Sequence, residues 1–337
     1  MEEQMVKLVI QIPCYNEAAE LPDTLAALPH DIPGVDVIET LVIDDGSTDG
    51  TTDVARSNGV NHVIRHRRNR GLAMAFQSGL EAALAIGADI IVNTDADGQY
   101  EGEDIAELVA PIVTGKADIV VGDRGVASVA HFHPVKRWLQ RLGSAVVRQL
   151  SGVAINDAVS GFRAMSREAA QRITITSSFS YTTDMLIQAG RKRMAITSVP
   201  IRSHPTERPS RLFKSIPGFI SRTLATMLRA YATYNPLRTF AALGALMLVI
   251  GLAPIIRFLW FWLNGDGSGH VQSLVLGGAL LVLGVITCLM AILADLIGAN
   301  RKLIETTLEH VRRLEEQSPQ KPCNESPKPS LKSDVKN

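Results

Sequence analysis

Three clusters of acidic and polar residues could do chemistry in this chain, and each follows a β-branched run that predicts a strand. They are Pro13-Cys14-Tyr15-Asn16-Glu17, Asp44-Asp45-Gly46-Ser47 and Asp95-Ala96-Asp97-Gly98. One acidic strand end is commonplace as a helix cap, but three on one sheet edge need another explanation. Clustered carboxylates repel one another unless a cation offsets them, and oxygen ligands suit Mg²⁺ or Mn²⁺. Such a cation would bridge a diphosphate and stabilise it as a leaving group.

Alternating strands and helices must position these clusters. β-branched runs predict strands at Leu8–Ile12, Thr40–Ile43, His62–Arg65, Ile90–Asn93, Ile119–Val121 and Thr197–Ile201. Apolar residues at helical spacing predict helices at Asn16–Leu28, Thr51–Ser57, Gly71–Ile86, Asp104–Val113 and Lys136–Leu150. This alternation predicts an α/β fold with a mostly parallel sheet covered on both faces. Ligands bind such sheets outside the carboxyl ends of the strands.

Two later segments are apolar enough to cross a membrane. Thr239–Leu263 is apolar apart from Arg257, and Leu274–Ala294 is 21 residues without a charge. Each exceeds the roughly 18 residues that span a hydrocarbon core of about 30 Å, which disfavours the alternative of two buried core helices. Basic residues flank both segments and are absent from the short loop between them. The positive-inside rule therefore places both termini and the sheet domain on the cytoplasmic side.

The stretch that leads into the first apolar segment is basic. From Arg208 to Gly265 there are seven basic residues and no acidic ones, which suggests an anionic membrane surface. Within it, Arg211–Tyr231 interleaves apolar with basic residues and predicts an amphipathic helix in the membrane interface. An ordinary surface helix of the sheet domain fits the same pattern.

Overall composition gives no indication of nucleic-acid binding, a disulfide framework or a zinc site. The 34 Lys and Arg residues balance 34 Asp and Glu residues, so the charge gives no reason to expect a nucleic-acid partner. Cys14, Cys288 and Cys323 are scattered without metal-ligand spacing, so neither a disulfide framework nor a zinc site follows.

The ordered motifs resemble those of the family-2 glycosyltransferases with the GT-A fold, a Rossmann-like, mostly parallel sheet. The resemblance covers about residues 7 to 313 and is nearest to the dolichyl- and polyprenyl-phosphate sugar synthases. It implies that the nucleotide sugar is bound by Pro13, Tyr15, Glu17, Asp44, Asp45, Asp95, Ala96, Asp97, Arg124 and Arg208. It places the metal on Asp97 and Gln99, with Asp95 beside them, although an exposed loop amide is the alternative reading of Gln99.

Basic residues extend the resemblance to the acceptor. Gly122-Asp123-Arg124 matches a motif whose arginine faces phosphate, a task that suits the guanidinium fork. The implied acceptor-phosphate residues are Lys136, Arg137, Ser160, Arg163, Ser210 and Arg211. Lys136 and Arg137 also fit plain helix-surface charge, and Arg211 stands where the family usually has lysine. The resemblance assigns the catalytic roles to Asp97, Arg124 and Arg208.

These residues imply an inverting, metal-dependent transfer of a sugar from a UDP- or GDP-sugar to a polyprenyl or dolichyl phosphate. A lipid phosphate has a second pKa of about 6, so it needs cationic guidance rather than a general base. A processive polysaccharide synthase is the nearest rival, but Pro134 replaces the glutamine of its Gln-x-x-Arg-Trp motif and only two spans are present. A membrane-anchored non-catalytic nucleotide-sugar binder is the rival from another class. A sugar-1-phosphate nucleotidyltransferase would need a Gly-rich loop after the first strand, which is absent.

The expected organisation has four parts. They are a GT-A domain at 1–207, a juxtamembrane amphipathic segment at 208–238, a transmembrane hairpin at 239–297 and a cytosolic helical and disordered tail at 298–337. The expected partners are a nucleotide sugar, a polyprenyl or dolichyl phosphate and the membrane. The sequence leaves open the donor base and sugar, the lipid type, the choice of Mg²⁺ or Mn²⁺ and whether the chain forms a homo-oligomer.

Overall fold

The computed structural model describes residues 5–125, 148, 152, 155, 157–175, 181–204, 229, 231–265 and 271–317. Its strands are β1 (Lys7–Cys14), β2 (Val37–Asp44), β3 (His62–Arg65), β4 (Ile90–Asn93), β5 (Ile119–Asp123), β6 (Arg163–Ser166) and β7 (Ile196–Pro200). Its helices are α1 (Leu21–Ala26), α2 (Thr51–Ser57), α3 (Leu72–Ala85), η1 (Gly102–Asp104, a 3-10 turn), α4 (Ile105–Val113), α6 (Arg167–Arg172), α7 (Tyr181–Arg191), α9 (Pro236–Leu263) and α10 (Val271–Gln317).

The seven described strands form one sheet in the order β3-β2-β1-β4-β6-β5-β7. Neighbours are parallel except where β6 pairs with β4 and β5, so the expected α/β class with a mostly parallel sheet is confirmed. The sequence predicts no strand at β6, because its four residues contain no β-branched side chain and begin with an arginine. Only pairing with β4 and β5 extends this segment.

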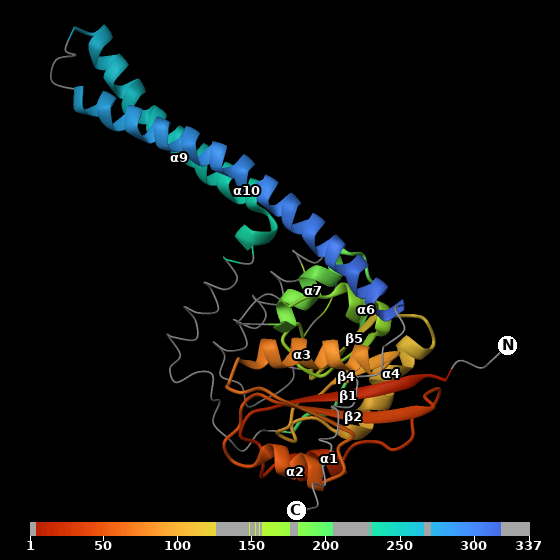
Figure 1. The fold of residues 1–337 in the computed structure, drawn as a ribbon. Coiled ribbons are helices and arrows are strands. Elements are labelled where there is room, and N and C mark those ends of the chain that lie inside the picture. Colours follow the sequence, from red (N-terminus) through yellow and green to blue (C-terminus); the bar gives the residue numbers. More distant parts are fainter. Residues whose placement is uncertain are drawn as a thin grey trace, which may run out of the picture.

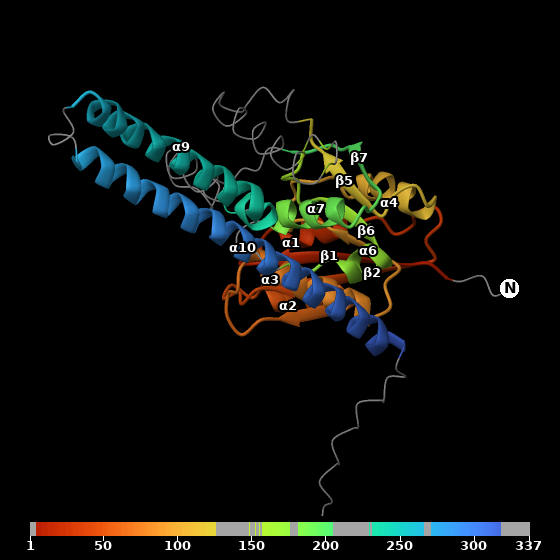
Figure 2. The same ribbon diagram turned by 90° about the horizontal axis from the view of Figure 1, so that it is seen from above.

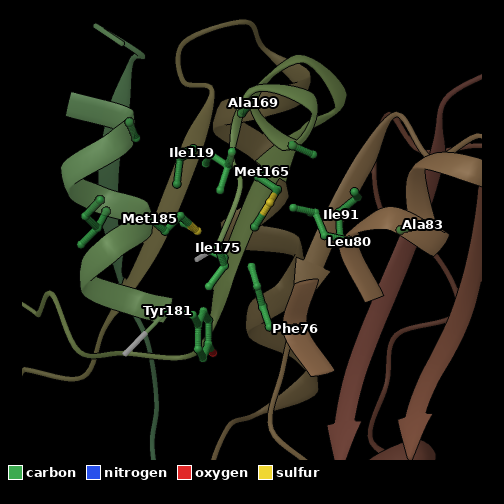
Figure 3. Packing of buried hydrophobic residues seen from close by; sticks show 14 of the residues in the cluster. Phe76, Leu80, Ala83, Ile91, Ile119, Met165, Ala169, Ile175, Tyr181 and Met185 are labelled. Atoms are coloured by element: carbon green, nitrogen blue, oxygen red, sulfur yellow. The ribbon is translucent and has the colours of Figure 1, made fainter. Parts of the chain in front are cut away.

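Side chains along the strands alternate between two hydrophobic cores, as the period of two in a strand requires. On β1, Val9 faces the core that α3, α6 and α7 cover, while Leu8 and Ile10 face the core beneath α1, α2 and α4. In the first core, Phe76 of α3 and Tyr181 of α7 stack with ring centroids 4.3 Å apart (Figure 3). Both faces of the sheet are therefore covered, and its carboxyl edge is left for ligands.

Two long helices leave the sheet domain together as a hairpin (Figures 1 and 2). Pro236–Leu263 and Val271–Arg301 are long and apolar enough to cross a membrane, and only 11% of each apolar window is buried. Proline at the start of α9 suits the first helical turn, where its missing N–H is not needed. Many of their leucine, isoleucine and valine side chains are exposed, as in a helix that could face lipid, and are not packed into a protein core.

Glycines let α9 and α10 approach closely. A Cβ built on Gly251 would lie 3.1 Å from the carbonyl oxygen of Gly277, and one built on Gly244 would lie 2.9 Å from that of Gly284. Small residues are the usual means of close helix packing in membranes. The glycines therefore leave room both for the facing backbone and for side chains such as Leu248, which packs over Gly284, and Ile255, which packs over Gly277.

Helix α10 extends beyond its apolar segment, which ends at Arg301. α10 continues through Gln317 and runs beside α6 of the sheet domain (Figure 1). Of the predicted helix Lys136–Leu150, only Arg148 belongs to the described residues, and of the segment Arg211–Tyr231, only Arg229 and Tyr231 do. Interfacial placement of that segment stays a prediction.

Candidate functional site

The three acidic clusters emerge on one edge of the sheet, as predicted. Parallel register pairs Cys14 at the end of β1 with Asp44 at the end of β2, and Gln11 with Asn93 at the end of β4. Burial raises the pKa of the Cys14 thiol. One carboxylate from each cluster raises it further, namely Glu17, Asp44 and Asp95, as does Asp49 just beyond the second cluster. The clusters are therefore close enough to interact with one another electrostatically.

The first two clusters are bound to each other. The Asn16 backbone has a φ of 54°, and its N–H donates to Ser47 Oγ at 2.9 Å while its Oδ1 accepts from the Thr48 N–H at 2.9 Å. Because Asn16 is committed to this turn, helix α1 begins at Leu21 instead of at Asn16 as predicted. Tyr15, beside this turn, is 40% exposed.

Asp44 and Asp45 are both buried, and both organise backbone turns. Asp44 accepts from the Ser47 N–H at 2.7 Å and from the Thr52 hydroxyl. Asp45 accepts from His66 Nδ1 at 2.7 Å and from the backbone N–H groups of Arg70 and Gly71 at 2.9 and 2.8 Å. These buried carboxylates therefore fix the turns that are predicted to surround the base.

An open pocket of about 420 Å³ lies beside these turns and escaped the sequence analysis. Its lining is Gly46, Ser47, Thr48, Arg65, His66 and Arg67. A Cβ on Gly46 would lie 2.5 Å from the Arg68 carbonyl carbon, so glycine is needed for the two turns to meet. The basic run after β3 is the sequence signal that could have pointed to this wall of the edge.

Asp95 and Asp97 differ in environment. Asp95 is partly buried and Asp97 is exposed, with its Oδ1 accepting from the Gln99 N–H at 3.2 Å. Burial, together with the charge of Asp97, raises the pKa of Asp95 to about 7, although Arg124 opposes the rise. Asp95 is thus a carboxylate that a nearby cation would return to its charged form.

These residues fit a divalent cation that keeps open coordination positions. Among the described residues no three His, Cys, Asp or Glu side chains converge as a closed metal site. Mg²⁺ is commonly held by one or two carboxylates, with water and substrate phosphates completing its shell. The oxygen groups of Asp95, Asp97 and Gln99 suit that arrangement.

Arg124 brings a fixed positive charge to the same edge. Its Nε and Nη2 donate to the two carboxylate oxygens of Asp157 at 2.7 and 3.0 Å, and its side chain is only 15% exposed. Burial lowers the pKa of Arg124, but the hydrogen bonds to Asp157 outweigh this effect and raise it above its usual range. Arg124 also acts electrostatically on Asp95, so donor-side acid and cation lie near each other.

The loop 157–163 is predicted to face the acceptor, but the structure gives Arg163 a different role from the predicted one. Arg163 is fully buried, and its three guanidinium nitrogens donate to the backbone carbonyls of Ser160, Thr182 and Ala158 at 2.7 to 2.8 Å. Burial lowers its pKa to about 10. The predicted phosphate contact is wrong for Arg163 in this arrangement, because all three nitrogens already bind backbone. Ser160 is also fully buried, with its N–H directed at Asp157.

Gly161 brings this loop against Asp95. Asn93 donates to the Gly161 carbonyl at 2.9 Å, and the Gly161 N–H donates to the Tyr100 hydroxyl at 3.3 Å. A Cβ on Gly161 would lie 3.1 and 3.2 Å from the carboxylate oxygens of Asp95. The sequence analysis missed Asn93 and Tyr100. A polar side chain at the end of a buried strand was the available signal for Asn93, whereas Tyr100 lies in the loop after β4 and carried no such signal.

Replacing Gly161 with alanine is expected to lower kcat by about tenfold while the protein stays folded, because misplacing a site by about 1 Å can cost a hundredfold. The added Cβ displaces the Asp95 carboxylate by a fraction of that distance. Steady-state kinetics of the purified protein measure the change. Gly278→Ala is the matched control, since its Cβ meets no atom within 4 Å. Equal activity of the two variants would contradict the contact.

The segment 201–204 is anchored on the loop that follows Asp97. Arg202 donates to Asp104 through Nε at 2.9 Å, and the His204 N–H donates to the Gln99 carbonyl at 2.9 Å. Tyr100 and Ser203 form an isolated bridge between the two segments. The remaining predicted site residues, Lys136, Arg137, Arg208, Ser210 and Arg211, lie outside the described part of the chain.

Comparison with solved structures shows the fold. Glucosyl-3-phosphoglycerate synthase from Mycobacterium tuberculosis, in complex with Mn²⁺, UDP and glucosyl-3-phosphoglycerate, aligns with a TM-score of 0.52 and 24% identity. The alignment covers 66% of this chain and 80% of that one. At this identity the likeness supports the expected GT-A fold and no more.

Sequence comparisons show the family. The family model "Glycosyl transferase family 2" matches residues 9–174. Glycosyltransferase AglJ of Haloferax volcanii is 28% identical over 315 residues, which are 91% of this chain and 97% of the relative. Undecaprenyl-phosphate mannosyltransferase of Micrococcus luteus is 30% identical over 206 residues, 58% of this chain and 83% of the relative. UDP-N-acetylglucosamine–dolichyl-phosphate N-acetylglucosaminyltransferase of Methanococcus voltae is 30% identical over 230 residues, 61% and 88% of the two chains. The chain is therefore a glycosyltransferase that belongs to glycosyl transferase family 2.

Proposed function

We propose that this protein transfers a sugar from a nucleotide sugar to a polyprenyl or dolichyl phosphate, with inversion at the anomeric carbon. One observation carries the proposal: Asp95 and the Asp157-bound Arg124 lie near enough to interact electrostatically, at the edge of a domain attached to a hairpin of membrane-spanning length. The relatives named for undecaprenyl and dolichyl phosphate acceptors support the same substrate class.

In the proposed reaction a phosphate oxygen of the lipid attacks the anomeric carbon of the sugar. The bond from that carbon to the donor diphosphate breaks, and the nucleoside diphosphate leaves with the electron pair. The lipid phosphate carries no proton that must be removed near neutral pH, because its second pKa is about 6. No general base is therefore required, and the protein has to bring two anions together.

The donor-side residues divide this task. Pro13, Tyr15 and Glu17 line the nucleoside, while Asp44 and Asp45 hold the turns around the base. Asp97 with Asp95 and Gln99 would hold Mg²⁺ or Mn²⁺, which when bound neutralises the leaving diphosphate. Arg124 adds a fixed cation whose direction Asp157 sets, and such preorganised charge is an effective way to stabilise a transition state.

On the acceptor side, we propose fewer residues than the sequence predicts. The candidate acceptor-phosphate ligands remain Lys136, Arg137, Ser210 and Arg211, and Arg208 keeps its proposed catalytic role. Among the described residues, no side chain takes the role predicted for Arg163. Ser160 contributes to the shape of the acceptor loop through its backbone N–H, which donates to Asp157. From the flanking charges we also propose that the sheet domain and both termini lie on the cytoplasmic side. The domain boundaries are proposed as predicted from the sequence.

The test offers UDP-glucose, UDP-N-acetylglucosamine and GDP-mannose in turn, with one polyprenyl phosphate, to the purified full-length chain. We expect one radiolabelled sugar to enter the lipid fraction as a single monosaccharide, and none to enter when polyprenol without phosphate is the acceptor. A product with several sugars would point to a processive synthase. Donor binding without transfer in any combination would support a non-catalytic binder and overturn the proposal.

A further inference from the structure

Tyr234 lies at the junction between the sheet domain and the membrane hairpin. Immediately before α9, it packs against the hydrophobic core that α3, α6 and α7 cover. The guanidinium of Arg191, at the end of α7, lies over its ring at 4.9 Å from the centroid, and that of Arg301 on α10 lies at 5.5 Å. Guanidinium groups at these distances are attracted to an aromatic ring, so one tyrosine joins elements of both parts.

Hydrogen bonds tie the same residue along α7. The Tyr234 hydroxyl donates to Asp184, a carboxylate that is 7% exposed, and Arg191 donates to the Tyr234 carbonyl. Arg191 also donates to the Asn235 side chain at 3.3 Å. Asp184 and Arg191 are two helical turns apart and lie on one face of α7. Tyr234 is therefore held along the helix rather than at a single point.

The N-terminal end of α7 reaches the site. The hydroxyl of Tyr181, its first residue, accepts from Asn93 at 3.3 Å and lies 3.2 Å from the place a Cβ on Gly161 would take. The carbonyl of Thr182 accepts from the buried Arg163 at 2.7 Å. With 11 residues at about 1.5 Å each, α7 is a rod of roughly 16 Å between the junction and the 157–163 loop.

We propose that Tyr234 is a positioning residue that couples the membrane hairpin to the 157–163 loop through α7. The inference rests on the proposed function, in which the acceptor is a lipid with its phosphate at the membrane surface. A firm junction keeps the loop at one height and tilt relative to that surface. A loose junction spreads these positions, so that fewer encounters with the head group are productive.

The test compares Tyr234→Leu and Arg301→Gln with the conservative variants Tyr234→Phe and Arg301→Lys, each as the full chain in phospholipid nanodiscs. Leucine keeps the apolar packing without the ring, and lysine keeps the charge at the membrane. We expect the first two to raise KM for a long-chain polyprenyl phosphate in the bilayer about tenfold, and the conservative pair to stay within about threefold. KM for the nucleotide sugar and kcat with a short-chain acceptor in detergent should change by less than about twofold.

Amide hydrogen exchange in the same nanodiscs gives a readout that does not need catalysis. Exchange in α7 and the 157–163 loop should quicken in Tyr234→Leu and Arg301→Gln, while α4, on the other face of the sheet, keeps its wild-type rate. Unchanged exchange in α7, or equal losses with long and short acceptors, would overturn the proposal. A wild-type protein that transfers sugar to neither acceptor refutes the proposed function instead, and exchange still decides whether Tyr234 couples the two parts.

Discussion

Replacing Asp97 with alanine is expected to lower the rate of sugar transfer by at least about a hundredfold, in line with the loss of one preorganised charge at a reacting centre. Asp97 is exposed at the sheet edge, and within its own turn it contacts the Gln99 N–H. It is thus the carboxylate freest to take a cation, whereas Asp95 is packed against Gly161. Asp97→Ala should also raise the concentration of Mg²⁺ or Mn²⁺ needed for half-maximal rate.

Transfer to polyprenyl phosphate, titrated with each metal and with a chelator, measures both effects. Glu107→Ala is the matched control, because Glu107 is an exposed acid on α4 of the same domain. Asp97→Asn separates charge from shape, and it should behave like alanine if charge is what matters. Undiminished transfer by Asp97→Ala would remove the metal role from this residue.

Replacing Arg124 with lysine is expected to lower kcat/KM by about a hundredfold, which corresponds to about 2.7 kcal/mol. Lysine keeps the positive charge but cannot bind both oxygens of Asp157 as the guanidinium fork does. Asp157 is 4% exposed, and a hydrogen bond to a buried charge contributes roughly 1.5 to 3 kcal/mol. The cation would therefore lose its direction toward the donor as well as part of its anchoring.

A double-mutant cycle with Asp157→Asn tests whether the two residues act as a unit. We expect the second substitution to add little once the first is present, because each breaks the same pair. Arg172→Lys is the stability control, since Arg172 pairs with Glu168 on the partly exposed helix α6. Fully additive losses, or an Arg124→Lys variant with wild-type kinetics, would show that the pair does not direct the cation.

Local pattern was enough to predict much of the sheet. His62–Arg65 and Ile90–Asn93 match β3 and β4 residue for residue, and β1 and β2 extend the predicted runs by one to three residues at each end. β-branched runs bounded by turn residues are strong local signals. β6 lacks such a signal, because its extended form comes from antiparallel pairing with strands distant in sequence.

The acidic edge with which the sequence analysis began was determined by the sequence alone. Parallel strands end on one side of a sheet, so acidic strand ends are neighbours whenever the strands are. What only the tertiary structure decided is which side chains remain free. Both Arg163 and Arg124 follow motifs that predict a phosphate contact. In the structure, Arg163 donates to three backbone carbonyls, whereas Arg124 is oriented by Asp157. Burial and hydrogen-bond partners depend on contacts between segments far apart in the chain. The contacts of Tyr234 with α7 depend on them in the same way. A local sequence pattern cannot predict such contacts, because they depend on where distant segments lie in the folded chain.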